Sequence, residues 1–166
     1  MIREIKTYPN KILKQKAKRV GKAELSPGRI DAEIKKLIDD MMETFYAKGG
    51  AGLAANQVGE SKQVVVLDVG DGLMVLINPK IISRKGQVVA PEGCLSLPGF
   101  EIEVKRPQKI FVEYVDKQGR EQKIKAEDLK ARVICHELDH LQGKTLLDKL
   151  PFLKRFFIKR KLSKQK

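Results

Sequence analysis

Both histidines of this 166-residue chain lie in one pentapeptide, His136-Glu137-Leu138-Asp139-His140. Residues four apart project from the same face of an α-helix, so the two imidazoles can bind one metal ion. The glutamate after the first histidine then reaches a water molecule on that ion, as in the HExxH pattern of metal-dependent hydrolases. Leu129 and Val133 continue the same face backwards, and the sequence predicts a helix over about 127–142 that stops at Gly143.

The pentapeptide leaves the third protein ligand open. A longer HExxH motif has a third histidine at the position of Leu146, so this chain lacks that ligand. A downstream glutamate cannot be the third ligand either, because no glutamate follows Glu137. The third ligand therefore comes from upstream or is a thiolate. Cys94, in the segment 92–98, is the obvious candidate, although a single cysteine is more often a small buried apolar residue. Cys135 is such a case, because it points about 100° around the helix from the histidine face. A disulfide between the two cysteines is the alternative, against which a cytoplasmic setting argues.

The size and composition of the chain exclude several classes of protein. A length of 166 residues suits one domain, and 42% hydrophobic with 33% charged residues is ordinary for a globular protein. Two cysteines are too few for a disulfide-dense secreted scaffold. The first ten residues, MIREIKTYPN, lack the apolar stretch of a signal peptide, and no run of about 18 apolar residues is present to span a membrane. We therefore expect a cytoplasmic protein without a membrane partner.

The remaining pattern predicts one α+β domain. An amphipathic helix is expected over about 31–47, with Asp31 suited to its N-terminus, and the glycine-rich segment 49–59 follows it. Strands are expected where β-branched and apolar residues gather or alternate, with Lys117-Gln118-Gly119 as a hairpin turn between the last two. The expected strands are 64–69, 73–78, 101–104, 110–116 and 122–126. A second apolar stripe on helix 127–142 predicts that this helix is central and buried.

Positive charge is concentrated near the C-terminal end. The chain has 34 Lys and Arg against 21 Asp and Glu, a net charge of +13, and residues 151–166 carry +7 of it without any acid. Four apolar residues fall on one stripe of a helix whose other sides are basic: Phe152, Leu153, Phe156 and Phe157. We expect 151–166 to form a basic amphipathic helical tail that docks through its phenylalanines.

Three segments together carry a family resemblance. They are Gly50-Ala51-Gly52-Leu53-Ala54-Ala55-Asn56-Gln57, then Glu92-Gly93-Cys94-Leu95-Ser96, and the histidine pentapeptide. They resemble the GxGLAAxQ, EGCLS and HExDH motifs of peptide deformylases, in the order and spacing of that family, and Tyr8-Pro9 with Leu13 resembles its usual start. One departure is Cys135, where the family commonly has Gln, which bears on how the helix packs near the pocket and leaves the metal ligands untouched.

The resemblance implies a fold and an activity. The fold has antiparallel strands wrapped around a central HExxH helix, and the activity removes the N-formyl group from N-formylmethionyl nascent polypeptides. The implied site comprises the metal ligands Cys94, His136 and His140, the acid/base Glu137, and two oxyanion donors, Gln57 and the backbone N–H of Leu95. In this family the physiological ion is typically Fe²⁺, and Zn²⁺, Ni²⁺ or Co²⁺ can also occupy the site.

The chemistry of these residues supports the implied roles. Two imidazoles and one thiolate leave one position of a tetrahedral ion for water, as catalytic sites do. Glu137 is placed to take the proton of that water and to return it to the leaving amine. Glycines let the backbone approach an extended peptide and pair with it as an added strand. The residues expected to bind substrate are Gly50, Ala51, Gly52, Gly93, Leu129 and Val133. We also expect Asp139 to be buried and paired with Arg106.

Two other functions stay open from the residues alone. An ordinary metallopeptidase shares the helix and the base. A structural-zinc protein that binds nucleic acid or the ribosome would use the positive charge, but a structural site usually has four protein ligands. The resemblance favours a monomeric catalytic domain over 1–150 with a nascent peptide as partner. The tail 151–166 is then a candidate for docking on the RNA-rich ribosome surface.

Overall fold

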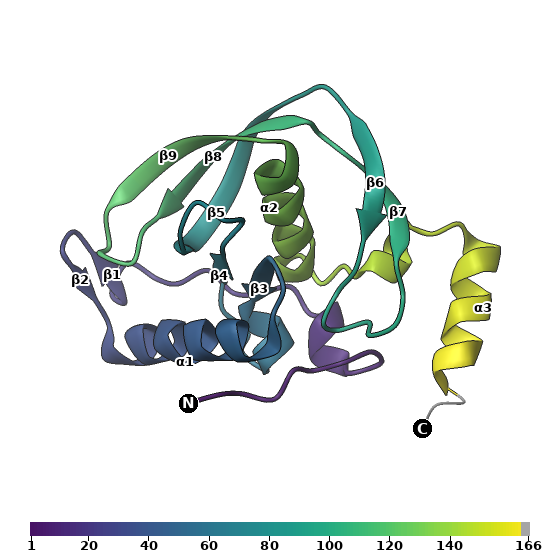
Figure 1. Ribbon diagram of the computed structural model, residues 1–166. Coiled ribbons are helices and arrows are strands. Elements are labelled where there is room, and N and C mark those ends of the chain that lie inside the picture. Colours follow the sequence, from purple (N-terminus) through teal and green to yellow (C-terminus); the bar gives the residue numbers. More distant parts are fainter. Residues whose placement is uncertain (164–166) are drawn as a thin grey trace.

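The computed structural model describes residues 1–163, whose strands form three antiparallel sheets (Figure 1). The largest sheet has the strand order β3-β4-β5-β8-β9 and consists of β3 (Gly52–Ala54), β4 (Val64–Leu67), β5 (Met74–Lys85), β8 (Lys109–Val115) and β9 (Glu121–Glu127). The two hairpins are β1 (Leu25–Ser26) with β2 (Arg29–Ile30), and β6 (Val88–Glu92) with β7 (Ile102–Arg106). The expected α+β class with antiparallel strands is confirmed.

Two helices lie within one residue of their expected ranges. Helix α1 (Ala32–Lys48) follows Asp31, whose carboxylate accepts a 2.8 Å hydrogen bond from the backbone N–H of Glu33. Helix α2 (Asp128–Leu141) ends before Gly143, whose φ of 70° is the left-handed conformation that glycine favours. Three single 3₁₀ turns complete the helical structure: η1 (Lys11–Lys14), η2 (Ala55–Val58) and η3 (Leu146–Lys149). No helix among residues 1–163 is long and apolar enough to cross a membrane.

Strand β4 joins two parts of the hydrophobic core. Successive side chains of a strand point to opposite faces of its sheet. Val65 and Leu67 therefore join the cluster that packs against α2, while Val64 and Val66 join the cluster beneath α1. All four side chains are fully buried. Helices cover both faces of β4, and this explains why its sequence is apolar throughout and does not alternate with polar residues.

Helix α2 lies in the middle of the molecule, with β5, β8 and β9 on one side and the β6–β7 hairpin on the other (Figure 1). Its side chains Ala131, Ile134, His140 and Leu141 are at most 1% exposed. The apolar ones pack into the cluster beneath the large sheet. Because α2 is enclosed in this way, polar groups on it must be partnered by protein or by a ligand.

Strands β5 and β6 extend beyond what the residue pattern predicts. The pattern predicts a strand over 73–78, whereas β5 continues to Lys85, and nothing in the pattern predicts β6. Most side chains in these parts are exposed, so no buried face produces apolar alternation. Pairing with β8 and β7 holds them as strands, and the β5–β8 register shifts twice along the way.

The C-terminal helix α3 (Phe152–Ser163) docks by a different face from the expected one. The exposed fractions are 76%, 53% and 65% for Phe152, Phe156 and Phe157. The helix instead packs Ile158 and Leu162, one turn apart, against the cluster that contains Leu146 and Leu147. The expectation that the phenylalanines dock this helix is wrong, because these two aliphatic residues occupy the inward face. Residues 164–166 of the expected tail lie outside the described residues.

Candidate active site and metal centre

Helix α2 brings three ionisable side chains to one place. His136 and His140 are one turn apart, with ring centroids separated by 5.0 Å, and Glu137 projects beside them. All three residues are buried, with exposed fractions of 9%, 1% and 3% for His136, His140 and Glu137. Buried groups of this kind require partners, so this side of the helix is arranged for a function rather than for packing.

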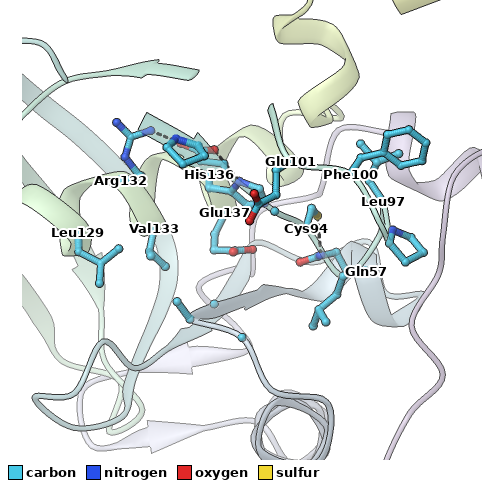
Figure 2. A pocket seen from close by; sticks show the side chains of 18 of the residues that line it. Gln57, Cys94, Leu97, Phe100, Glu101, Leu129, Arg132, Val133, His136 and Glu137 are labelled. Carbon is cyan, nitrogen blue, oxygen red and sulfur yellow. Dashed lines mark hydrogen bonds and ion pairs between the residues drawn. The ribbon is translucent and has the colours of Figure 1, made fainter. Parts of the chain in front are cut away.

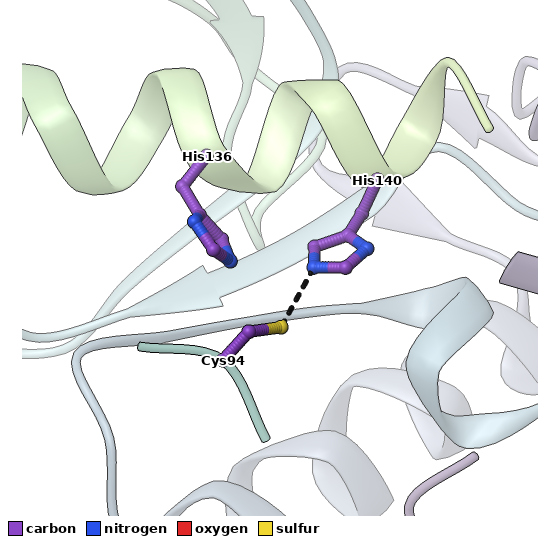
Figure 3. Close-up of side chains that lie close together, drawn as sticks. All are labelled: Cys94, His136 and His140. Carbon is purple, nitrogen blue, oxygen red and sulfur yellow. Dashed lines mark hydrogen bonds between the residues drawn. The ribbon is translucent and has the colours of Figure 1, made fainter. Parts of the chain in front are cut away.

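Cys94 reaches the histidines from the loop after β6 (Figure 3). Its Sγ lies 3.1 Å from Nε2 of His140, and one ligand atom from each of Cys94, His136 and His140 lies within 4.8 Å of the others. Two imidazole nitrogens and a thiol sulfur suit a borderline divalent ion such as Zn²⁺ or Fe²⁺. Three protein ligands leave one position of a tetrahedral ion for water.

The surroundings of the two histidines shift their pKa values in opposite directions. Burial and the nearby His136 lower the pKa of His140 well below its usual value, which keeps the neutral imidazole that binds metals. Burial also lowers the pKa of His136, but hydrogen bonds with Cys94 and Glu92 outweigh it and raise that pKa to about 10. The bare protein therefore holds a proton where a divalent cation would displace it. The donor set fits a divalent metal ion.

Glu137 is a buried carboxylate with spare hydrogen-bonding capacity. Burial raises its pKa to about 7, close to the value that suits proton transfer at neutral pH. Its Oε2 has no hydrogen-bond partner among residues 1–163. A buried carboxylate oxygen without a protein partner is available to a water molecule or a substrate group.

A cleft of about 580 Å³ opens in front of these residues. Figure 2 shows Leu129 and Val133 at one end, His136 and Glu137 in the middle, and Gln57 toward the other end. This cleft is lined by nearly all the residues that the sequence assigns to catalysis, substrate binding and metal binding. The exception is His140, which is buried behind the cleft. The assigned residues that line it are Gly50, Ala51, Gly52, Gln57, Gly93, Cys94, Leu95, Leu129, Val133, His136 and Glu137. The fold therefore brings together segments that are far apart in the sequence.

The side-chain amide of Gln57 is oriented by its neighbours. Its Oε1 accepts a 2.8 Å hydrogen bond from the backbone N–H of Ala54. Its Nε2 lies 3.2 Å from Oγ of Ser96 and 3.6 Å from Sγ of Cys94. Because the carbonyl end is already used, the NH₂ end faces the ligand side, which is the orientation that an oxyanion donor needs.

Gly52 on β3 makes a close approach to the helix. A Cβ atom at this position would lie 2.6 Å from Oε1 of Glu137 and 2.8 Å from Cγ1 of Val133. Side chains other than hydrogen would therefore displace Glu137 or Val133. The glycine is needed here for space, since its backbone is not in the left-handed region.

The sequence reasoning missed an ion-pair network behind His136. Glu92 accepts hydrogen bonds from Nδ1 of His136 at 2.9 Å, from Nε and Nη2 of Arg106 at 2.8 and 2.9 Å, and from Nη1 of Arg132 at 2.8 Å. Burial raises the pKa of Glu92, but the hydrogen bonds from Arg106 and His136 outweigh it and lower the pKa to about 2. Arg132 precedes His136 by one helical turn, and that spacing is the signal by which it was detectable.

Two smaller expectations concern residues on the side of α2 turned away from the cleft. The expected pair is confirmed, since Nη1 of Arg106 lies 2.5 Å from Oδ2 of Asp139. The Asp139 side chain is nevertheless 21% exposed and also pairs with Lys149 at 2.7 Å.

Cys135 is 6% exposed, and burial raises the pKa of its thiol. Cys94 and Cys135 are both free thiols, so the disulfide alternative is wrong.

A buried HExxH helix, a thiol close to both histidines and an open cleft in front of them are the features of a metal-dependent hydrolase. The model of the polypeptide deformylase family matches residues 2–156. The chain therefore belongs to the peptide deformylase family.

Relatives and solved structures agree with this assignment. The chain is 48% identical over 149 residues to the peptide deformylase of Caldanaerobacter subterraneus, covering 90% of this chain and 89% of the relative. It is 42% identical to that of Thermodesulfovibrio yellowstonii over 170 residues, covering 99% of both. The crystal structure of peptide deformylase from Ehrlichia chaffeensis in complex with actinonin superposes with a TM-score of 0.91 at 39% identity, covering 99% of this chain and 98% of that one.

The family assignment decides among the functions that the sequence left open. Peptide deformylases are metal-dependent hydrolases that remove the formyl group from nascent polypeptides, and this is the activity of the chain. The metallopeptidase and the structural-zinc protein are thereby set aside.

Proposed function

We propose that Cys94, His136 and His140 hold one divalent metal ion, Fe²⁺ in the cell, with Zn²⁺, Ni²⁺ or Co²⁺ as alternatives. The observation that carries this assignment is the convergence of the three ligand atoms within 4.8 Å, behind a cleft and beside Glu137. When bound, such an ion lowers the pKa of a water molecule and polarises the formyl carbonyl. The thiolate and the two neutral imidazoles supply a soft, mixed donor set that accepts several ions.

Glu137 is the proposed acid and base. It takes a proton from the attacking water as the water oxygen bonds to the formyl carbon. It then delivers that proton to the amine nitrogen as the carbon–nitrogen bond breaks, so the products are formate and a free amino terminus. The unpartnered Oε2 of this carboxylate supports the role, because it leaves one oxygen for the water.

Gln57 and Leu95 are proposed to stabilise the negative charge that develops on the formyl oxygen. The orientation of the Gln57 amide supports its share, and the backbone N–H of Leu95 follows directly on the ligand Cys94. One well-placed donor of this kind contributes about 3 kcal/mol to the transition state. The two donors are fixed before the substrate arrives, which keeps the cost of reorganisation low.

The substrate is proposed to lie as an extended strand along β3, which is an edge strand of the large sheet. Gly50 and Gly52 let the peptide backbone approach, and Gly93 lines the opposite wall. Ala51, Leu129 and Val133 are proposed to receive the methionine side chain, which needs an unbranched apolar pocket. The narrow space beside the metal ligands excludes acyl groups larger than formyl.

The same proposal extends to the catalytic domain, the location of the enzyme and the C-terminal tail. Residues 1–150 form the catalytic domain, with strands wrapped around the HExxH helix α2, and the enzyme acts as a monomer in the cytoplasm, where nascent chains emerge. The basic tail 151–166 docks on the ribosome surface through phosphate contacts. Supporting this, Lys154, Lys159 and Lys161 are exposed on α3.

A direct assay tests the site assignment. Wild type and Glu137→Gln are purified anaerobically, their metal content is measured, and both are assayed on formyl-Met-Ala. We expect both proteins to contain about one ion, and the variant to lose at least 100-fold in kcat, because the proton transfer is lost.

Two controls separate the alternatives. Cys94→Ala is expected to lose the bound ion as well as activity, since a ligand is removed. Full activity of Glu137→Gln would refute the assigned base. Cleavage of an internal peptide bond without release of formate would refute deformylation.

A further inference from the structure

A strongly basic surface lies on the side of α2 turned away from the catalytic cleft. Two hollows of about 490 and 660 Å³ adjoin there, because both are lined by Arg84, Lys105, Arg106 and Pro107. Exposed cations from β5, β7 and the segment after α2 surround them; these are Lys80, Arg84, Lys85, Lys105, Lys144 and Lys149. We call this surface the basic face.

The basic face has almost no negative charge of its own. Asp139 is the one acid that lines either hollow within residues 1–163, and it already pairs with Arg106 and Lys149. None of the ion pairs within residues 1–163 includes Arg84, Lys85, Lys105 or Lys144. Like charges gathered on one surface repel one another and attract a compensating polyanion from outside.

We propose that the basic face binds the phosphodiester backbone of RNA. The proposal rests on the proposed function, since nascent polypeptides are presented where RNA is abundant. Cations supplied by three separate segments form an extended array, which matches a chain of phosphates better than a single phosphate ion. Gln87 and Gln142 line the same hollows and add amide donors for phosphate or ribose oxygens.

Helix α2 separates this face from the active site. Cys135, Leu138, Asp139 and Gln142 line the hollow, whereas Leu129, Arg132, Val133, His136 and Glu137 line the catalytic cleft. No side chain of α2 is shared between the two, so RNA on the basic face leaves the cleft accessible to a peptide.

Binding of a labelled 16-base-pair RNA duplex tests the proposal through fluorescence anisotropy at several salt concentrations. The full-length variant Lys80→Gln, Arg84→Gln, Lys105→Gln, Lys144→Gln removes four cations of the basic face. We expect it to lose at least tenfold in affinity at low salt. The slope of log affinity against log salt is expected to fall by about 3, since each phosphate contact contributes roughly 0.7 to 0.9.

The matched control removes the same charge elsewhere. Lys22→Gln, Lys35→Gln, Lys36→Gln, Lys48→Gln changes four exposed lysines near and on α1 and leaves net charge equal to that of the first variant. We expect its slope to stay within about 1 of wild type. Equal losses in both variants would overturn the proposal, because net charge alone would then explain binding. Both retain the tail, so its contribution cancels.

Two further measurements complete the test. Both variants are expected to keep wild-type activity on formyl-Met-Ala, which shows that they fold. If the wild type lacked that activity, the proposed function would be refuted. The RNA measurement would still test the basic face, because it does not depend on catalysis. Poly-glutamate that binds wild type as tightly as the RNA, with the same dependence on the four cations, would overturn RNA as the partner.

Discussion

Glu92 accepts a hydrogen bond from Nδ1 of His136 across 2.9 Å. Because a carboxylate can only accept, this contact places the imidazole proton on Nδ1 and leaves Nε2 facing Cys94 and His140. Arg106 and Arg132 hold the carboxylate from the other side. Glu92, two positions before Cys94, therefore orients the His136 nitrogen that is proposed to bind the metal.

Glu92→Gln is expected to lower metal affinity by about 10- to 100-fold, because the partner that fixes the tautomer of His136 is weakened. The measurement is competition with a chelator of known affinity. Glu103→Gln, on the exposed face of β7, is the control and is expected to retain metal as wild type does. Unchanged affinity in Glu92→Gln would show that the tautomer is set elsewhere.

Gly52→Ala is expected to reduce kcat/KM at least tenfold, because the added methyl group would overlap Glu137 and Val133. Metal content is expected to persist, since no ligand changes. Gly21→Ala provides the control: its Cβ would meet only the flexible end of Glu24 at 3.3 Å. Wild-type turnover by Gly52→Ala would mean that the close approach has no catalytic consequence.

Arg106→Leu and Asp139→Asn are expected to differ in their cost. Arg106→Leu leaves the buried carboxylate of Glu92 with fewer partners and is expected to lower the free energy of unfolding by about 3–5 kcal/mol. Asp139→Asn removes one charged acceptor at a partly exposed site and is expected to cost about 1–2 kcal/mol. Urea unfolding of the metal-free proteins measures both, and equal costs would contradict the description of the network.

Asp148 predicts a pH dependence of stability. Burial raises the pKa of its carboxyl, but hydrogen bonds from Lys14 and the Thr145 backbone outweigh it and lower the pKa below the usual value. A carboxyl with a lowered pKa stabilises the fold above its unfolded pKa, near about 3.9, and this contribution disappears as the pH falls through the folded pKa.

Asp148→Asn is therefore expected to be about 1–2 kcal/mol less stable than wild type at pH 7, with the difference shrinking below about pH 4. Urea unfolding at a series of pH values measures this difference. Asp39→Asn, at an exposed position of α1, is expected to show little change at any pH. A constant difference for Asp148→Asn across the series would exclude its ion pair as the cause.

Glu101 predicts a preference among peptides. It lines the cleft and is exposed, and it forms no hydrogen bond or ion pair within residues 1–163 (Figure 2). The other charged groups of the cleft are paired with one another or are assigned to proton transfer, so Glu101 is the carboxylate available to a substrate residue after methionine. We expect formyl-Met-Ala-Lys to exceed formyl-Met-Ala-Glu in kcat/KM by about threefold at low salt, as suits an exposed charge pair.

Glu101→Lys is expected to reverse that order, and added salt is expected to bring the ratio of the two kcat/KM values closer to 1 in both proteins. The control, Glu103→Lys, changes an acid two residues along that does not line the cleft. The same ratio in wild type and Glu101→Lys would remove Glu101 from peptide selection.

Features that depend on nearby residues were predictable from the sequence. The i and i+4 spacing of His136 and His140 requires only a helix, and Asp31 and Gly143 mark helix ends through hydrogen bonds and backbone freedom within a few residues. The apolar run of β4 likewise reports burial on both faces. The exposed continuation of β5 was not predictable in this way, because its strand pairing depends on β8 rather than on its own residues.

By itself, the sequence determined the HExxH helix, the three family motifs and the concentration of charge near the C-terminus, because each is a local pattern of residue types. Only the tertiary structure decided how Glu92 joins Arg106, Arg132 and His136, and why Gly52 has no room for a side chain. It also decided that α3 docks through Ile158 and Leu162 instead of its phenylalanines. These relationships are contacts between distant segments, and residue spacing carries no information about which buried surface a distant side chain meets.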